Sequence, residues 1–157
     1  MTTVMLYGKT VIYRIEDKLE TRVEKELFEY FKNLVAEVER AFSDELTNYK
    51  FDSYSDFELK LPAAIAKARD VLQRNKGTLS ERRYLFWDIW SYGKTDGKYK
   101  GIEMPYAVIE ITEDGWIYMF RAYTRVAYIY SKKIVGIETE VWYYKYIAVT
   151  HEPLSDD

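Results

Sequence analysis

The clearest pattern along the chain is a row of apolar residues at helical spacing between Asp17 and Ser43. Apolar side chains recur every three or four residues, and Glu and Lys occupy the positions between them. This spacing gathers the apolar side chains on one face of an α-helix and leaves the charged ones on the other. The apolar positions are Leu19, Val23, Leu27, Phe31, Leu34, Val35, Val38 and Phe42. We therefore expect a long amphipathic helix that buries one side.

Shorter elements are predicted on both sides of this helix. Residues 3–7 and 10–14 are rich in Val, Ile, Thr and Tyr, and the Gly-Lys pair between them suits a two-residue hairpin turn. Residues 57–61 alternate apolar and charged side chains, as a half-buried strand does. Pro62 then suits the first turn of a second helix, which Gly77 would end.

A third, short helix is predicted after the second. Residues 78–81 fit a capping box, and further residues follow at helical spacing through Asp88. A strand over 85–90 is the alternative, because aromatic residues favour strands as well. Residues 93–101 are then expected to form a loop rich in Gly and Lys.

The remainder of the chain has the pattern of a β-meander. Runs of β-branched and aromatic residues alternate with turn signals, of which Asp114-Gly115 is the strongest. A two-residue turn there would set Ile109 opposite Phe120, on a face that packs against the helices. On the other face, Glu110 would pair diagonally with Arg121. The predicted strands cover residues 105–113, 116–123, 126–131, 134–139 and 141–150.

These elements predict a single α+β domain over residues 1–157. An N-terminal hairpin, the long amphipathic helix and two shorter helices would pack on a C-terminal antiparallel β-meander, and the polar tail over 151–157 would fray. No apolar run approaches the roughly 20 residues of a transmembrane helix, and no secretory signal is present. We therefore expect no membrane contact and an intracellular location. The absence of cysteine excludes disulfides and thiolate metal sites.

Charge changes this picture, because the bases are concentrated in the middle of the chain. Residues 67–101 carry nine Lys or Arg against four acids, a net charge of +5, whereas the flanks together carry −8. A basic segment with aromatic residues among its charges is typical of a nucleic-acid contact. The alternative is the solvated face of a helix whose last bases interact with the helix dipole. The bases expected to position phosphates are Arg74, Lys76, Arg82, Arg83, Lys94 and Lys98.

Three acids in or near this segment are candidates for catalysis. Glu81 and Asp88 lie among the bases, where a carboxylate repels DNA unless it holds a metal ion or activates water. Glu58 follows Asp56 at a spacing of two, as in the paired acids that hold Mg²⁺ or Mn²⁺ in nucleotidyl-transfer enzymes. Structural alternatives stay open: helix capping for Glu81, an ion pair with a neighbouring arginine for Asp88, and the wet face of a strand for Glu58.

The composition adds a resemblance. Gln occurs once, Asn three times and Cys not at all, beside abundant Glu and Lys, a balance typical of hyperthermophiles. Together with the tyrosine-rich stretch 115–133, GWIYMFRAYTRVAYIYSKK, the chain resembles small orphan α+β proteins of viruses that infect hyperthermophilic archaea. The resemblance is one of size and composition over the whole chain. That group includes DNA nucleases, one of them from a filamentous virus, as well as DNA-binding proteins, virion proteins and inhibitors of host defence.

We therefore expect a nuclease or related phosphodiester-processing enzyme that acts on DNA. It would use Glu81, Asp88 and Glu58 together with Mg²⁺ or Mn²⁺. The alternative is a non-catalytic DNA-binding or host-protein-binding accessory protein, in which these acids are structural. A homodimer is a further expected form of partner contact, through the edge of the meander.

Overall fold

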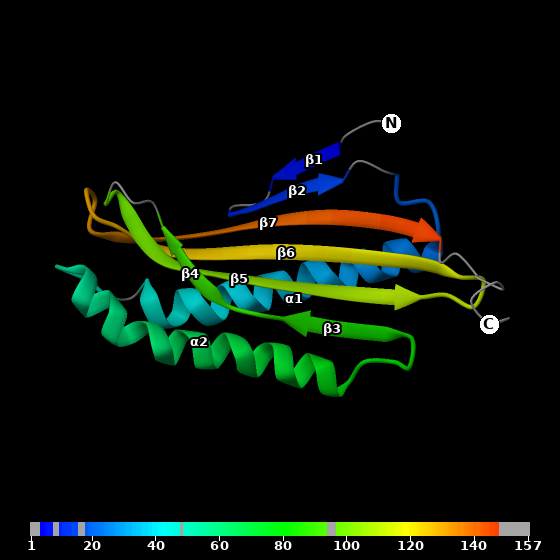
Figure 1. Cartoon of the computed structure of the whole chain (residues 1–157), viewed down its shortest axis with the longest axis horizontal. Coiled ribbons are helices and arrows are strands. Elements are labelled where there is room, and N and C mark those ends of the chain that lie inside the picture. Colours follow the sequence, from blue (N-terminus) through cyan, green and yellow to red (C-terminus); the bar gives the residue numbers. More distant parts are fainter. Residues whose placement is uncertain (1–3, 8–9, 16–17, 48, 94–96, 148–157) are drawn as a thin grey trace, which may run out of the picture.

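The computed structural model describes residues 4–7, 10–15, 18–47, 49–93 and 97–147. It has two layers, a β-sheet and two helices that lie side by side against one face of the sheet (Figure 1). The α+β class is therefore confirmed. The helices are α1 (Arg22–Leu46) and α2 (Tyr54–Gly77), and the strands are β1 (Val4–Tyr7), β2 (Val11–Ile15), β3 (Arg83–Trp87), β4 (Trp90–Gly93), β5 (Tyr99–Ile111), β6 (Trp116–Ile129) and β7 (Ile134–Ile147).

Helix α1 forms where the apolar spacing predicts it, displaced a few residues toward the C-terminus. A capping box fixes its start: the Thr21 hydroxyl accepts a hydrogen bond from the Glu24 amide (3.1 Å), and the Glu24 carboxylate accepts one from the Thr21 amide (2.9 Å). Glu24 is fully buried, and the hydroxyl of Tyr143 on β7 donates to its other oxygen. The buried apolar stripe consists of Leu27, Phe31, Leu34, Val35, Val38, Ala41, Phe42 and Leu46.

Helix α2 corrects the strand predicted over 57–61, because these residues lie within the helix. The helix starts after Ser53, whose hydroxyl accepts a hydrogen bond from the amide of the third helical residue (3.3 Å). Leu59, which the predicted alternation places on the buried face of a strand, is 82% exposed. Pro62 lies well inside the helix rather than in its first turn, while Gly77 ends it as predicted. The buried positions recur at helical spacing and are Phe57, Leu61, Ala64, Ala68, Val71 and Leu72.

The short third helix is a wrong prediction. After a turn over 78–82 the chain continues as β3 and β4, which both pair antiparallel with β5 and are separated by a bend at residues 88–89. Leu85, in the middle of β3, is 1% exposed. Pairing of this β-prone segment with β5 and burial of Leu85 outweigh the local capping signal. The alternative, a strand over 85–90, is closer to the structure.

Three long strands form the centre of the sheet in place of five short ones. β5, β6 and β7 pair antiparallel in sequence, so this part of the meander is confirmed, but the chain runs through the predicted breaks at 124–125 and 140. The N-terminal hairpin forms, and β2 pairs in parallel with β7, which makes the sheet mixed. The strand order is β1-β2-β7-β6-β5-β3, with β4 also on β5. Turn residues 8–9 and the tail over 151–157 lie outside the described residues.

The register between β5 and β6 differs by one residue from the predicted hairpin. A main-chain hydrogen bond of 2.9 Å closes a three-residue loop over 113–115, in which Gly115 takes a φ of 91°. Phe120 therefore pairs with Val108 and not with Ile109. Because side chains alternate along a strand, this slip sends each side chain of β5 to the face opposite to the predicted one. Val108 is buried under the helices, and Ile109 lies on the other face.

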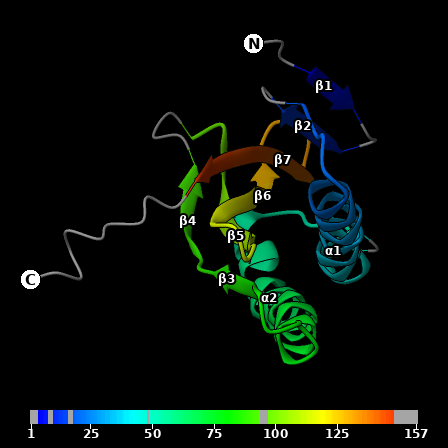
Figure 2. The ribbon, with the colours of Figure 1, turned by 90° about the vertical axis from the view of Figure 1, so that its right-hand side faces the viewer.

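The two helices cover only one face of the sheet. Figure 2 shows the sheet curving around α1 and α2, with no described helix or strand on its other side. The uncovered face is therefore a large exposed surface of this fold.

Neither described helix is long and apolar enough to span a bilayer.

Candidate functional site

The three predicted catalytic carboxylates lie on separate parts of the fold. Glu58 lies near the start of α2 and Glu81 in the turn after it, with roughly 28 Å of helix between them. Asp88 lies beyond β3, whose five residues span about 17 Å, and its Oδ1 accepts a hydrogen bond from the Ile89 amide (2.7 Å). Among the described residues no group of three His, Asp or Glu side chains could hold a metal ion. The fold does not bring these carboxylates together, and Mg²⁺ or Mn²⁺ stays a prediction.

The bases predicted to hold phosphates are largely engaged within the chain. Lys76 lies over the ring of Trp87, with 5.4 Å between Nζ and the ring centroid. Lys98 is exposed, and Lys94 lies outside the described residues. Three bases form ion pairs: Arg74 with Asp70 (3.0 Å), Arg82 with Glu113 (2.9 Å) and Arg83 with Glu110 (2.6 Å). These ion pairs reduce the positive electrostatic field that the sequence predicts for this segment.

The uncovered face of the sheet, which we call the open face, is a second candidate site. The strand registers place Phe86, Ala107, Arg121 and Trp142 in one row across four strands. On one side of this face lies an apolar half, formed by Tyr84, Phe86, Ala107, Ile109, Ile111, Ile117, Met119, Arg121, Trp142, Tyr144 and Tyr146. Beside it lies a polar half, formed by Trp90, Tyr92, Glu103, Tyr123, Arg125, Glu138 and Glu140. Arg14 is counted with this half because its guanidinium pairs with Glu140, although its strand position continues the row of Trp142.

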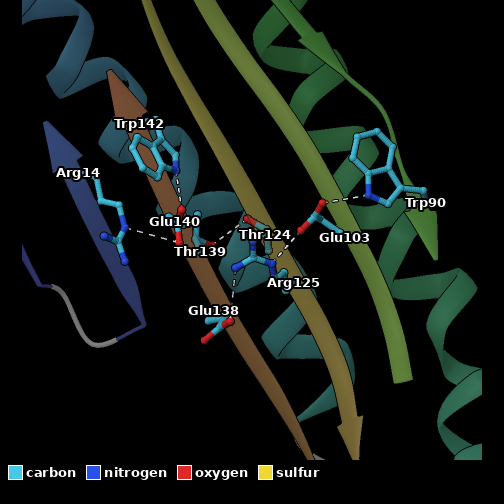
Figure 3. Close-up of polar contacts among 9 residues, drawn as sticks. All are labelled: Arg14, Trp90, Glu103, Thr124, Arg125, Glu138, Thr139, Glu140 and Trp142. Atoms are coloured by element: carbon cyan, nitrogen blue, oxygen red, sulfur yellow. Dashed lines mark hydrogen bonds and ion pairs between the residues drawn. The ribbon is translucent and has the colours of Figure 1, made fainter. Parts of the chain in front are cut away.

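The charges of the polar half pair with one another (Figure 3). Glu103 also accepts a hydrogen bond from the indole N–H of Trp90 (2.9 Å). Glu140 accepts one from the indole N–H of Trp142 (2.5 Å). The ion pairs are Arg125 with Glu103 (2.7 Å), Arg125 with Glu138 (3.6 Å) and Arg14 with Glu140 (3.7 Å). All three carboxylates of this half therefore have partners, and none is available for catalysis without breaking a contact.

Arg121 differs from the other two arginines of the open face. No acid among the described residues lies within ion-pair distance of it, and its guanidinium lies over the ring of Tyr123 (5.0 Å). Glu110, its predicted partner, pairs instead with Arg83 (2.6 Å), because the observed register turns Glu110 to the helix-covered face. Within the described part of the chain, the apolar half thus carries one positive charge without a counter-charge.

A hollow of about 310 Å³ lies beside Arg121. It is lined by Ala107, whose neighbours in the row, Phe86 and Arg121, are much larger. Phe86 and Trp90, on the edge strands, border the hollow and are 53% and 44% exposed. Met119 lines it as well. A small residue among large ones leaves this space in an otherwise filled surface.

A second hollow, of about 330 Å³, lies at the far end of the polar half. Ala127 and Gly136, which are partners in the register, contribute to its lining. Tyr92 and Tyr99 border it with stacked rings 5.3 Å apart. Burial, and then the hydrogen bond with Tyr99, raises the pKa of Tyr92 to about 12. Tyr92 therefore stays protonated at neutral pH and offers a stacking surface rather than a base.

Sequence reasoning missed the row that joins Phe86, Arg121 and Trp142. The one available signal was the abundance of aromatic residues after residue 84, which does not say which face each side chain occupies. That face depends on the register, and the register depends on the length of one loop.

In comparisons with known proteins, no family model matches the chain, and no curated protein or solved structure matches it either. The open face combines a hollow with an arginine that no described acid pairs, and these two features are the basis for inferring a function.

Proposed function

We propose that the protein is a non-catalytic binding protein that contacts a protein partner through the apolar half of the open face. The observation that carries this proposal is the exposed area of that half. Five side chains are between 36% and 53% exposed: Tyr84, Phe86, Ile111, Tyr144 and Tyr146. At roughly 200 Å² per large side chain they present about 430 Å² of mainly apolar surface. The largest apolar patch of a typical monomer covers about 300–600 Å² and is often functional, and this patch falls within that range.

The residue types of the apolar half support a protein partner. Interface cores are enriched in aromatic residues, Met and Arg, and depleted in Lys, Glu and Asp. The apolar half contains Tyr, Phe, Trp, Ile and Met side chains with one arginine, and neither lysine nor acid occupies its strand positions. Trp, Tyr and Arg also dominate the few residues that supply most of the binding energy in interfaces.

The charge of the open face favours protein over DNA. Its strand positions hold three arginines and three glutamates, and two of the arginines are paired with those acids. DNA binding instead requires an excess of bases that neutralise phosphates. Cleavage of DNA stays a prediction from the sequence, and its three carboxylates, Glu58, Glu81 and Asp88, lie apart.

Panning a phage library of random dodecapeptides on the purified chain tests the proposal. Short peptides gain most where they bury apolar surface, so we expect the selected peptides to bind the apolar half. Phe86→Ser and Tyr144→Ser should each weaken their binding by about tenfold or more in calorimetry. Leu59→Ser is the matched control, since Leu59 is 82% exposed but lies on α2. It should change the affinity by less than about twofold.

The outcomes separate the alternative partners. Selected peptides that keep their affinity for both open-face variants would overturn the proposal. Binding of duplex DNA that falls steeply with salt, without any peptide binding, would favour a nucleic-acid partner instead. A dimer in light scattering that Phe86→Ser converts to a monomer would identify a second copy of this chain as the protein partner.

A further inference from the structure

We infer, on the basis of the proposed function, that the hollow beside Arg121 binds a flat apolar side chain of the partner together with an adjacent carboxylate. Two features of the open face carry this inference: the size and lining of the hollow, and the charge of Arg121 at its rim, which no described acid pairs. Each feature specifies one part of the ligand.

The hollow has the size and lining for one large ring. Its volume of about 310 Å³ equals the space of roughly ten water molecules in the liquid. Ala107 and Met119 line it, and the exposed ring of Phe86 borders it, so a ring that enters is surrounded mainly by apolar atoms. Burying an aromatic side chain in such a pocket is the usual source of a binding hot spot.

The carboxylate is specified by Arg121. A guanidinium has five N–H donors in a planar fork that matches a carboxylate, and no acid among the described residues lies within ion-pair distance of Arg121. Arg125, two rows away on the same face, is already paired with Glu103 (2.7 Å). The indole N–H of Trp90 is likewise engaged by Glu103 (2.9 Å), so Trp90 offers the hollow its ring and not a free donor.

Asp88 also lines the hollow, but it does not oppose an anion at Arg121. Phe86 and Arg121 share a row across two strand spacings, and Asp88 follows Phe86 by two residues. The Cα atoms of Asp88 and Arg121 are therefore about 12 Å apart. An acid in direct contact with Arg121 is therefore closer to the guanidinium than to Asp88, and Coulomb interaction weakens with distance. An acid that reaches Arg121 is attracted more strongly than it is repelled.

Two small probes distinguish the contribution of the ring to binding from that of the carboxylate. N-acetyl-tryptophan carries an indole and a carboxylate, and N-acetyl-tryptophanamide carries the same ring without the charge. In nuclear magnetic resonance titrations of the ¹⁵N-labelled chain we expect the first to bind with a Kd on the order of 1 mM and to shift the amides of Ala107 and Met119. The amide probe should bind about fivefold more weakly, because it lacks the ion pair.

Variants assign the preference to Arg121. Arg121→Gln should remove the difference between the two probes, whereas Arg14→Gln, at an arginine of the same face that is paired with Glu140, should preserve it. Ala107→Leu fills the hollow and should abolish binding of both probes. Unchanged amide positions outside the open face show that each variant is folded.

The failures of the two proposals are distinguishable. Equal affinity for the two probes, discrimination that survives Arg121→Gln, or no shift at the hollow with either probe overturns this inference. Peptide binding to the apolar half could still hold in each of these cases. If the selected peptides bind the Phe86→Ser and Tyr144→Ser variants as tightly as the wild type, the proposed function fails, regardless of how the two probes bind.

Discussion

Replacing Gly101 by alanine should destabilise the sheet far more than the same replacement at Gly136. Both glycines lie in one row, on either side of Ala127 of β6. A Cβ on Gly101 would lie 1.9 Å from the carbonyl oxygen of Val126 and 2.6 Å from the Cα of Ala127, both backbone atoms. A Cβ on Gly136 would meet, at 3.2 Å, only the end of the flexible Ile129 side chain.

The expected magnitude follows from these contacts. A separation of 1.9 Å is roughly 1.5 Å shorter than van der Waals contact, so β5 must move away from β6 at Gly101. Overpacking costs about 1–3 kcal/mol, and each backbone hydrogen bond broken by the displacement adds about 1 kcal/mol. We expect Gly101→Ala to lower the free energy of unfolding by about 3–5 kcal/mol. Gly136→Ala should change it by less than about 1 kcal/mol, because a stiffer unfolded chain offsets the contact.

Urea unfolding followed by circular dichroism measures both variants against the wild type. Both change the same residue type in the same row, so intrinsic strand propensity cancels between them. A Gly101→Ala variant as stable as Gly136→Ala would refute the close approach of β5 and β6. It would also remove the physical reason for a glycine near the start of β5.

Two further predictions concern the buried polar groups on the helix-covered face. The hydroxyls of Tyr106 and Thr124 are 2.9 Å apart in the core, so Tyr106→Phe and Thr124→Val should each cost about 1–2 kcal/mol in urea unfolding. The double variant should cost about 1 kcal/mol less than the sum, because it leaves no unpaired tyrosine hydroxyl, and strictly additive costs would contradict this pairing. Burial raises the pKa of Glu24, but hydrogen bonds from Tyr143 and Thr21 outweigh it and hold the pKa below the usual value. The ionised Glu24 therefore stabilises the fold above the unfolded-state pKa of about 4.3, and this stabilisation is lost as the pH falls through the folded-state pKa. In melting experiments below about pH 5, the Glu24→Gln variant should therefore lose less stability on acidification than the wild type. Equal losses in the two proteins would contradict this prediction.

The helices show where sequence periodicity is sufficient and where it is not. The apolar stripe of α1, from Leu27 to Leu46, repeats over about five turns of helix, so only a helix satisfies it, and the prediction is confirmed. Residues 57–61 are too few to distinguish a strand from a helix, since Phe57 and Leu61 fit both periods. Tertiary burial against α1 and the sheet decides the outcome, and Leu59 becomes exposed.

The open face was not predictable for a related reason. Its row joins Phe86, Arg121 and Trp142, which come from three strands. The sequence predicts a hairpin at Asp114-Gly115 but does not fix the length of its loop. A two-residue loop and a three-residue loop place Ile109 on opposite faces of the sheet. Only the three-residue loop turns Glu110 to the helix-covered face, where it pairs with Arg83 and not with Arg121. The excess of Lys and Arg over residues 67–101 is a property of the sequence, but Arg74, Arg82 and Arg83 form ion pairs within the chain and are not free to bind phosphate.

Mapping the tightest selected dodecapeptide on the ¹⁵N-labelled chain by nuclear magnetic resonance decides whether the open face is a contact surface. We expect saturable shifts at the amides of Phe86 and Met119 and at the indole N–H of Trp142, with the exposed surface of α2 around Leu59 unchanged. Saturable shifts confined to the helices, with the three open-face signals unmoved, would contradict the proposal that this face binds the partner.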